Sequence, residues 1–357
     1  MNDTNKIKIM HLLNTGKFSG AENVAISIID NMKKDFDFIY VSRDGSIRSI
    51  LEEKSISFFL VREISIKNIR SIIKNYKPDM IHAHDYTSSA IAALTFTKIP
   101  IISHLHNNSP WIGRFGAKSI FFALLCTRYK KILTVSNSIM DEYKFGRFFR
   151  YNTNVIGNPI DITYIKQKAI SKKTDKLYDI AFLGRLTSSK NPLVFIDIVR
   201  KVLEILPDTK VCMIGDGDLR KEVEEKILYL GLKGTITVYG FQKNPYSILN
   251  NTKILCMPSK WEGFGLGAIE ALSLGKPVVC SGAGGLKEIV DNNCGKICGI
   301  VEEYVSEIDR LLEDKVYYQL KSDAALQKAL NMDNTNSYYQ ELLKIYQNCI
   351  DLSNGGG

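Results

Sequence analysis

The pattern of hydrophobic and polar positions changes its period repeatedly along the chain. Short runs rich in Val and Ile alternate with longer stretches whose apolar residues recur every three to four positions. The short runs have the composition of buried strands, and the longer stretches have the period of amphipathic helices. The predicted strands are residues 7–13, 38–42, 57–61, 80–83, 100–104, 132–135 and 154–156, then 179–183, 210–214, 235–239, 254–257, 277–280 and 296–299.

Helical patterns fill the intervals between these runs. The predicted helices are residues 21–32, 69–76, 88–96, 119–128 and 139–143, then 193–205, 219–230, 266–274 and 301–312. Such alternation is typical of parallel sheets covered by helices on both faces. Thirteen strands are many for one open sheet, and 357 residues exceed the usual size of a single core. We therefore predict two doubly wound, Rossmann-like α/β domains.

A polar, lysine-rich stretch over residues 165–176 has the composition of a linker between these domains. It predicts an N-terminal domain over residues 1–165 and a C-terminal domain over residues 177–330. The last helical segment, residues 337–350, carries one apolar stripe that consists of Tyr339, Leu342, Leu343, Tyr346 and Ile350. Because such a stripe needs an apolar surface, we expect this helix to pack back on the N-terminal domain.

The composition and the N-terminal pattern predict where the protein is located in the cell. Apolar residues make up 45% of the chain and charged residues 24%, as in ordinary globular proteins. The N-terminus lacks the pattern of a secretory signal, and no apolar run reaches the roughly 18 residues of a membrane-spanning helix. Cys294 and Cys298 form the only close pair of the seven cysteines, and the five histidines all lie before residue 107. We therefore predict a cytoplasmic protein without a metal site.

The formal net charge of +9 is unevenly distributed. Residues 114–150 contain eight Lys and Arg against two acidic residues, interleaved with large apolar side chains. This pattern suits a segment lying on an anionic membrane surface, and it equally suits a buried helix with solvated basic ends. The first interpretation predicts a peripheral protein at the inner face of the plasma membrane. No nucleic-acid-binding motif accompanies the charge, so nucleic acid is not an expected partner.

Glycine recurs just after strands, at the edge where open α/β folds bind their ligands. In the second half, Gly184, Gly215 and the run from Gly263 to Gly265 follow three different strands. Each turn alone is ordinary, but together they predict a crevice with many backbone N–H groups. No dinucleotide fingerprint or P-loop sequence is present.

Charged residues in these turns suggest which ligand the crevice binds. Arg185, Lys190 and the N-terminus of the helix that begins near Phe264 together form a candidate diphosphate site. Glu262 precedes that helix, and Glu270 lies inside it, about 12 Å away if the interval is helical. Two carboxylates in this arrangement can accept hydrogen bonds from hydroxyls on both sides of a diphosphate, as in a nucleotide sugar. The structural alternatives are a solvated cationic loop, a helix-capping Glu262 and a Glu270 that bonds a neighbouring strand.

The string "EGFGLGAIE" resembles the Glu–seven–Glu motif of retaining glycosyltransferases of family 4, which have the GT-B fold. "NTGKFSGAE", "TVSNS", "VIGNPID" and "FLGRLTSSKN" are similar to other parts of that family, in the same order along nearly the whole chain. The resemblance implies two Rossmann-like domains facing across a cleft. It also implies transfer of a sugar from a nucleotide-diphosphate donor, with UDP-sugars favoured, and no metal or other cofactor.

The resemblance assigns roles to individual residues. Catalytic roles fall to Glu262, His106, Arg185 and Lys190, and acceptor contacts to His106 and Asn107. His82 and His104 are interpreted as packed side chains. The donor-binding set consists of Gly16, Gly20, Gly184, Arg185, Lys190, Gly215, Glu262, Gly263, Phe264, Gly265, Leu266, Glu270 and Glu288. The N-terminal glycine loop departs from the family pattern, because only Gly20 stands where two adjacent glycines are usual.

The implied reaction is a front-face displacement in which the diphosphate leaves and the acceptor hydroxyl attacks from the same side. The basic segment favours a lipid-linked saccharide acceptor, of the kind used for capsular polysaccharide, exopolysaccharide or O-antigen. Two alternatives remain at this point. A nucleotide-sugar epimerase of similar shape would release nucleotide without an acceptor, and a sugar-binding protein would bind free sugar but no nucleotide.

Overall fold

The computed structural model describes residues 6–171 and 176–354. The chain divides into two compact units, with the divisions after Pro159 and after Asn334. The first unit contains the N-terminal part of the chain and its last helix, and the second contains residues 160–334. No helix among the described residues is long and apolar enough to cross a membrane.

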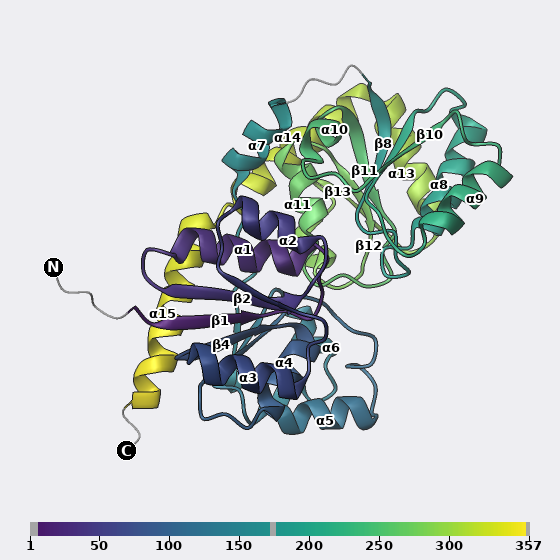
Figure 1. Cartoon of the computed structure of the whole chain (residues 1–357). Helices are drawn as coiled ribbons and strands as arrows, with labels where there is room; N and C mark the ends of the chain where they lie inside the picture. Colours follow the sequence, from purple (N-terminus) through teal and green to yellow (C-terminus); the bar gives the residue numbers. More distant parts are fainter. Residues whose placement is uncertain (1–5, 172–175, 355–357) are drawn as a thin grey trace. The chain divides into compact units, whose positions relative to one another are not determined.

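The first unit consists of alternating strands and helices (Figure 1). Its strands are β1 (Lys8–Leu12), β2 (Asp37–Arg43), β3 (Phe58–Val61), β4 (Met80–His84), β5 (Ile101–Leu105), β6 (Lys131–Thr134) and β7 (Thr153–Val155). Its helices are α1 (Gly20–Met32), α2 (Ile47–Glu53), α3 (Ile66–Tyr76), α4 (Asp85–Leu94), α5 (Ala117–Cys126), α6 (Ser138–Glu142), η1 (Gly146–Phe148), η2 (Arg150–Asn152) and α15 (Thr335–Asn354).

The sheet of the first unit is parallel, with the order β3-β2-β1-β4-β5-β6-β7 within the described residues. The order reverses between β1 and β4, which is the switch point where doubly wound folds open a crevice. α15 packs on one face of this sheet, where Tyr338, Leu342 and Tyr346 join a core that also contains residues of β1, β2 and α1. Of the apolar stripe predicted for residues 337–350, Leu342, Tyr346 and Ile350 are buried in the first unit, and Tyr339 and Leu343 pack against the same core while remaining partly exposed.

The second unit repeats the same architecture. Its strands are β8 (Tyr178–Leu183), β9 (Val211–Ile214), β10 (Ile236–Gly240), β11 (Thr252–Met257), β12 (Val278–Ser281) and β13 (Gly295–Cys298). Its helices are α7 (Ile162–Ile170), α8 (Pro192–Ile205), α9 (Arg220–Tyr229), α10 (Tyr246–Asn250), α11 (Leu266–Ser273), α12 (Leu286–Ile289), α13 (Val301–Glu313) and α14 (Lys315–Leu330).

The second sheet is also parallel, with the order β10-β9-β8-β11-β12-β13. Apolar clusters cover both of its faces, one including α11 and the other α8 and α13. The predicted fold class of two doubly wound α/β domains is confirmed. The thirteen predicted strands correspond to the seven strands and six strands of the two sheets.

The boundary between the units differs from the predicted linker. The first part of the lysine-rich stretch forms α7, and the division comes before this helix rather than after it. Ile162, Ile165 and Ala169 make a buried stripe on α7, which contacts α10 and α11. Because these apolar positions are three to four residues apart, the segment forms a packed helix despite the lysines around them. Residues 172–175 of the predicted linker lie outside the described residues.

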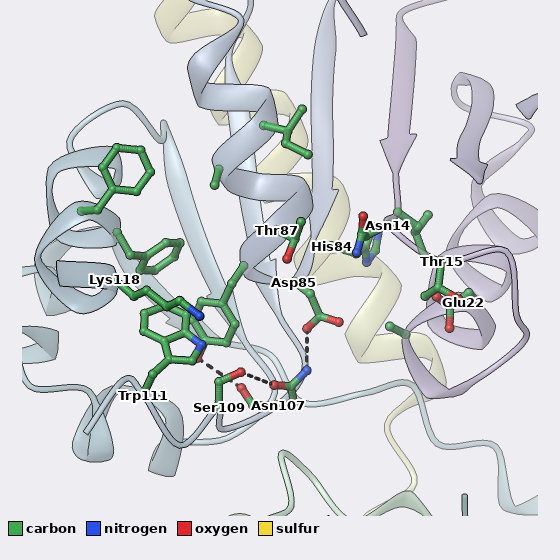
Figure 2. Close-up of a pocket in the computed structure, with 17 residues that line it drawn as sticks. Asn14, Thr15, Glu22, His84, Asp85, Thr87, Asn107, Ser109, Trp111 and Lys118 are labelled. Carbon is green, nitrogen blue, oxygen red and sulfur yellow. Dashed lines mark hydrogen bonds between the residues drawn. The ribbon is translucent and has the colours of Figure 1, made fainter. Parts of the chain in front are cut away.

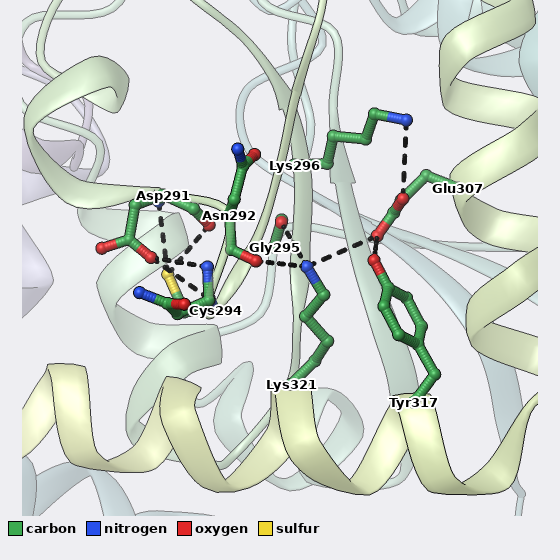
Figure 3. A network of polar contacts seen from close by, with 9 residues as sticks. Asp291, Asn292, Cys294, Gly295, Lys296, Glu307, Tyr317 and Lys321 are labelled. Carbon is green, nitrogen blue, oxygen red and sulfur yellow. Dashed lines mark hydrogen bonds and ion pairs between the residues drawn. The ribbon is translucent and has the colours of Figure 1, made fainter.

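A buried polar network ties α13 and α14 to the strand β13 (Figure 3). Glu307 is 3% exposed, and its carboxylate accepts a 2.9 Å hydrogen bond from the Tyr317 hydroxyl. The Lys321 ammonium lies 3.9 Å from Glu307 and donates to the carbonyl oxygens of Asn292 and Gly295. Such a network stabilises the fold only while each charge keeps its partner.

Cys294, one member of the close cysteine pair, lies beside this network (Figure 3). Its thiol lies near the main-chain carbonyls of Ile289 and Asp291, and both Cys294 and Cys298 are buried as free thiols. Burial raises the pKa of the Cys298 thiol to about 12, so it is a neutral packed group.

Candidate functional site

Two glycines bring the loops after β8 and β9 into direct backbone contact. Gly184 and Gly215 both have a positive φ, 152° and 139°. A Cβ at Gly215 would lie 1.9 Å from the carbonyl oxygen of Gly184, so no larger residue fits there. The N–H of Gly215 donates to the carbonyl of Gly240 at 2.9 Å. The predicted glycine turns thus form one continuous loop surface at the carboxyl edge of the second sheet.

The loop that carries Glu262 is fixed on two sides. Its Lys260 N–H donates to the carbonyl of Ser189 at 2.8 Å, which joins it to the loop after β8. On the other side, Gly284 has a φ of 50°, and a Cβ there would lie 1.6 Å from the Glu262 carbonyl oxygen. The next residue, Gly285, donates its N–H to the same oxygen at 3.3 Å. The backbone at Glu262 is therefore held between the loops after β8 and β12.

Lys190 and Glu262 form an ion pair within this surface. The Lys190 ammonium donates to the Glu262 carboxylate, and their side chains are only 18% and 11% exposed. Gly184 lies under the lysine, because a Cβ at that position would contact the Lys190 side chain at 3.6 Å. Arg185, on the same loop, is exposed. The site thus contains one paired cation and one solvent-facing cation.

Glu270 lies in the second turn of α11 with a different partner. The hydroxyl of Tyr246, at the start of α10, donates to Glu270 Oε1 at 3.1 Å. Burial raises the pKa of Glu270 to about 7, although the Tyr246 hydrogen bond and the positive charge of Lys190 act in the opposite direction. The Glu270 carboxylate in turn raises the pKa of the Tyr246 hydroxyl. Glu270 is therefore poised to change its ionisation near neutral pH.

The N-terminus of α11 lies between the two carboxylates. Gly265 is its N-cap in a left-handed conformation, with a φ of 102°, and no side chain caps the helix there. Its position packs against Leu286 of α12, whose Cδ2 would lie 2.9 Å from a Cβ at 265. Phe264 packs on the apolar core of the unit, and Glu288 is exposed on α12. The uncapped N–H groups and the positive end of the helix dipole are suited to an anion.

The first unit has a separate cavity of about 450 Å³ at the carboxyl edge of its sheet (Figure 2). The polar part of its lining comes from the loop after β1 and from the starts of α1 and α4, and an aromatic part from α5 and the loop before it. The lining includes Asn14, Thr15, Glu22, His84, Asp85, Asn107, Ser109, Trp111, Lys118 and Phe121.

Asp85 organises the polar end of this cavity. It is a non-glycine residue with a φ of 65°, a conformation that is costly and often maintained at functional sites. Its Oδ1 accepts hydrogen bonds from the His106 main-chain N–H at 3.2 Å and from the Asn107 amide at 3.0 Å. Ser109 then donates to Asn107 at 3.1 Å, as Figure 2 shows. The loop after β5 is thus tied to the start of α4.

The aromatic end of the cavity provides an apolar wall. Trp111 packs edge-on against Tyr86 with ring centroids 5.0 Å apart, and Tyr86 packs in the same way on Phe122. Lys118 and Phe121, on the first turns of α5, line the cavity and are also exposed on the protein surface. A polar end beside an aromatic wall is a common arrangement for binding small ligands.

Comparison with known proteins agrees with this geometry. The model of Glycosyltransferase Family 4 matches residues 18–164, and the model of Glycosyl transferases group 1 matches residues 164–330. Together the two models span residues 18–330, and the chain belongs to the glycosyltransferases of family 4, group 1. Its two parallel sheets and its structural relatives identify the GT-B fold.

Two individual relatives of this family 4 glycosyltransferase cover most of the chain. It is 24% identical to the UDP-Gal:α-D-GlcNAc-diphosphoundecaprenol α-1,3-galactosyltransferase of Escherichia coli, over 87% of this chain and 89% of that protein. The crystal structure of HepE from Anabaena in complex with UDP-glucose superposes with a TM-score of 0.82, at 20% identity over 96% of this chain and 100% of the other.

A third relative is WaaG, described as a glycosyltransferase involved in lipopolysaccharide biosynthesis. Its structure has a TM-score of 0.73 at 14% identity, over 98% of this chain and 100% of the other. Because the two solved structures are less than 25% identical, they show the fold of this glycosyltransferase and not its substrates.

The structure brings most of the predicted donor residues of this glycosyltransferase together at one edge of the second sheet. The exceptions are Gly16 and Gly20, which lie in the first unit. A Cβ at Gly16 would lie 2.3 Å from the Asp44 carbonyl oxygen, and Gly20 begins α1. His82 and His104 are fully buried, which confirms their interpretation as packed side chains. Asn107 lines the first unit's cavity, whereas His106 does not; His84, to which His106 is hydrogen-bonded, does.

Several residues of the two sites were not predicted. Tyr246 and Asp85 are the clearest, since each bonds a predicted residue directly. Asp85 had a usable signal, because it directly follows the strand β4 at the ligand-binding edge. Lys118 lies within the basic segment of residues 114–150, which the sequence suggested to be either a membrane surface or a buried helix with solvated basic ends, and Trp111 lies just before that segment.

Proposed function

We propose that this glycosyltransferase moves a sugar from a UDP-sugar to a saccharide acceptor, with retention of the anomeric configuration. The observation that carries the proposal is the arrangement of Lys190, Glu262 and Glu270 around the uncapped N-terminus of α11. It combines positive charge for a diphosphate with two hydrogen-bond acceptors for hydroxyl groups.

The proposed roles follow from these chemical types. Arg185, Lys190 and the N–H groups between Gly263 and Leu266 bind the diphosphate. Glu262 accepts from hydroxyls of the transferred sugar, and Glu270 from the ribose hydroxyls. The close contact between Gly184 and Gly215 fixes the two loops on which the donor would lie. Glu288 lines the donor pocket from α12.

The same groups support a mechanism that needs no metal ion. Negative charge grows on the diphosphate as its bond to the sugar breaks, and fixed positive groups stabilise it most in the transition state. Lys190, Arg185 and the end of α11 supply that charge. The leaving oxygen then accepts the proton of the acceptor hydroxyl, which attacks the same face of the sugar.

UDP is the proposed nucleotide. The galactosyltransferase relative uses UDP-Gal by its name, and the HepE structure holds UDP-glucose. The proposed acceptor is a lipid-linked saccharide used in surface-polysaccharide synthesis, since the same relative acts on a diphosphoundecaprenol acceptor. The cavity of the first unit is the proposed acceptor site, with Trp111 as the wall on which a sugar ring packs and Asp85 and Asn107 as polar contacts.

The surface beside this cavity supports a membrane-bound acceptor. On α5, Phe122 and Leu125 are buried, whereas Ile120, Phe121 and Leu124 are exposed by 39%, 47% and 65%. The helix thus presents a second apolar face to solvent, beyond the one that packs on the core. Phe115, Phe148 and Tyr151 are also exposed, and the nearby exposed cations are Arg114, Lys118, Arg128, Lys144, Arg147 and Arg150.

Exposed apolar side chains among cations match the chemistry of an anionic lipid surface. We infer that the α5 surface, defined as Phe115, Ile120, Phe121 and Leu124 with these cations, lies at the inner face of the plasma membrane. An acceptor saccharide in the cavity would then have its lipid beside Phe121, which belongs to both the cavity and this surface.

A thermal-shift panel of UDP, GDP and their sugars tests the donor assignment. A ligand present at 100 times its dissociation constant stabilises the fold by about 2.7 kcal/mol, which such a scan resolves. We expect stabilisation by UDP and UDP-sugars without added metal, and turnover only when a saccharide acceptor is present. Nucleotide release without acceptor, or stabilisation by free sugar alone, would contradict the proposal.

A further inference from the structure

All five histidines of the chain gather at one place in the first sheet. His11 lies on β1, His82 and His84 on β4, and His104 on β5, with His106 just after it. His11 is paired with His82 across the sheet, and His84 with His104. His11, His82, His84 and His104 are at most 1% exposed, and His106 is partly exposed.

The imidazoles form two separate hydrogen-bonded chains. In the first chain, His106 Nε2 lies 2.8 Å from His84 Nδ1, and His84 Nε2 lies 2.9 Å from His11 Nδ1. In the second, His104 Nδ1 lies 3.1 Å from His82 Nε2, and His82 Nδ1 lies 2.7 Å from the Tyr346 hydroxyl. The first chain ends at the partly exposed His106, and the second ends in the core at α15.

The two chains are stacked on each other. The rings of His82 and His84 are 4.4 Å apart with an interplanar angle of 19°, and those of His104 and His106 are 4.1 Å apart. Two sets of three histidines have ring nitrogens close enough to surround a metal ion. However, each nitrogen between two rings already shares a proton with its neighbour, so a metal would have to replace these hydrogen bonds.

Each ring in the first chain is neutral. Burial lowers the pKa of His11 to about 3 and that of His106 to about 3, and it lowers the pKa of His84 well below its usual value. A neutral imidazole has one N–H and one acceptor nitrogen. With two hydrogen bonds among three rings, only two proton arrangements are consistent: all three rings carry the proton on Nδ1, or all three carry it on Nε2.

The buried end of the chain distinguishes these two arrangements. Nε2 of His11 is buried without a hydrogen-bond partner among the described residues. The all-Nε2–H arrangement would leave a buried N–H without an acceptor there, whereas the all-Nδ1–H arrangement leaves only an unused lone pair. Unpaired buried N–H groups are the rarer and costlier of the two. The chain therefore favours donation from His11 to His84 and from His84 to His106.

We propose that His84 and His11 are positioning residues that hold His106 in its Nδ1–H tautomer. His106 then offers a hydrogen-bond donor, not a base, on its partly exposed side. This inference rests on the proposed function insofar as the oxygen that receives this hydrogen bond belongs to a substrate sugar. It agrees with a front-face reaction, in which the leaving diphosphate and not a histidine accepts the acceptor's proton.

Nitrogen-15 NMR of the full chain, labelled at histidine and free of ligand, measures the tautomers directly. Ring nitrogens with and without a proton have well-separated shifts, and five histidines allow assignment by single substitutions. We expect His106 to carry its proton on Nδ1. In His84→Phe, which keeps a ring but removes both nitrogens, His106 should shift toward Nε2–H, the tautomer that free histidine prefers. His11→Phe should produce a mixture.

Tyr346→Phe is the matched control, because it interrupts only the second chain and should leave the His106 tautomer unchanged. Unperturbed signals from the remaining histidines show that each variant is folded, and His11→Phe provides the test if His84→Phe does not fold. Finding His106 as Nε2–H in the unsubstituted protein, or unchanged in both variants, would overturn the proposal.

Kinetics separate this inference from the proposed function. We expect His84→Phe to lower kcat about tenfold, the value of one lost hydrogen bond, with the donor KM unchanged. If His106→Ala keeps full activity while the tautomer result holds, the catalytic role of His106 fails and the positioning survives. If the tautomer result fails while His106→Ala is inactive, His106 is catalytic but His84 and His11 do not set its tautomer.

Discussion

Lys190 and Glu262, which lie 72 positions apart in the sequence, form an ion pair at the edge of the second sheet. The proposed function gives them different ligands, the diphosphate for Lys190 and a sugar hydroxyl for Glu262. Donor binding therefore has to break the ion pair between Lys190 and Glu262 and to replace it with one contact from each side chain to the donor. In the absence of donor, each side chain holds the other in place and neither charge is left unpaired.

Substituting either residue should remove transfer activity and leave the fold intact. For Glu262→Ala and Lys190→Ala we expect kcat/KM to fall at least about 100-fold, the usual loss when one preorganised charge is removed from a reacting group. Arg185→Ala should behave in the same way. Steady-state kinetics together with circular dichroism spectra measures both parts of this prediction.

The matched control is Lys221→Ala on α9, because the Lys221–Glu225 pair is 84% and 63% exposed. Such exposed pairs contribute little to stability, and this one lies outside the proposed site. Full activity in Glu262→Ala would contradict the site assignment, whereas equal losses in Lys221→Ala would point to a general effect of removing charge.

If Glu270 binds the donor as proposed, donor binding should depend on pH. With a pKa of about 7, its carboxyl is largely protonated at pH 6 and largely ionised at pH 8. A carboxylate accepts hydrogen bonds from both ribose hydroxyls, so UDP-glucose should bind more weakly at pH 6 than at pH 8. Calorimetry in buffers of different ionisation enthalpy should detect a proton released on binding at pH 6. Glu270→Gln should lose this pH dependence.

The same carboxyl should affect stability with the opposite sign. The unfolded chain loses this proton near pH 4.5, whereas the folded protein keeps it until about pH 7. The folded state therefore becomes less stable as the pH rises through this interval, by on the order of 3 kcal/mol at most. Urea unfolding should show that Glu270→Gln is stabilised relative to the unsubstituted protein at pH 8 and not at pH 4.5. If Glu270→Gln differs from the unsubstituted protein by the same free energy of unfolding at both pH values, burial does not raise the pKa of Glu270 as described.

Gly284 should be required for the position of Glu262 and not only for the local turn. A Cβ at 284 would lie 1.6 Å from the Glu262 carbonyl oxygen, so Gly284→Ala must displace that loop. Gly231→Ala is the matched control, since Gly231 also has a positive φ, of 70°, but no atom lies within 4 Å of its added Cβ. We expect about 1 kcal/mol of destabilisation in the control, from the backbone conformation alone.

Gly284→Ala should cost more than this and should also weaken UDP-glucose binding. Urea unfolding and calorimetry measure the two effects. If both glycine variants lose the same stability and bind donor equally, the contact between Gly284 and the Glu262 loop is not needed for the site.

The buried network at Glu307 predicts a large stability effect away from the site. Glu307→Ala removes the acceptor of the Tyr317 hydroxyl and leaves the buried Lys321 ammonium without its carboxylate (Figure 3). Breaking one side of a buried pair costs about 3–5 kcal/mol. Glu302→Ala, also on α13, breaks an exposed pair with Lys201 of α8 and should cost less than about 1 kcal/mol. If urea unfolding shows similar losses of stability in Glu307→Ala and Glu302→Ala, the buried pair is not worth more than the exposed one.

The sequence allowed the prediction of both sheets, because continuous Val- and Ile-rich runs are a sufficient signal for buried parallel strands. It did not reveal α14, whose buried face consists of Lys321, Ala325 and Ala329 rather than large apolar residues. α7 was missed for a related reason, since its lysines disguised three buried apolar positions. Helices with small or sparse apolar faces are recognisable only once their partner surface is known.

Within the sites, residue types were predicted but their partners were not. Glu262, Glu270 and Lys190 stood out because charged residues beside glycine turns are chemically conspicuous. Tyr246 bonds Glu270 across 24 positions, and the histidines of β1, β4 and β5 meet only through strand pairing. Such contacts depend on strand order and register, which no local pattern in the sequence specifies.

The α5 surface should determine whether the enzyme reaches a lipid-linked acceptor. Ile120→Asp with Leu124→Asp places two anions on its exposed apolar face without touching the buried Phe122 and Leu125. We expect the double variant to lose co-sedimentation with vesicles of phosphatidylglycerol and phosphatidylcholine. Binding of the unsubstituted protein should weaken as salt rises, because the cations around α5 contribute through screened charge.

The control for this surface is Leu228→Asp with Tyr229→Asp, since both residues are exposed apolar positions on α9 of the second unit. It should bind vesicles like the unsubstituted protein. With a water-soluble acceptor analogue, the α5 variant should keep its kcat, because its substitutions leave Trp111 and Asp85 in place. Loss of activity on the soluble analogue would mean that α5 shapes the acceptor cavity itself, and unchanged vesicle binding would show that the exposed apolar face has another purpose.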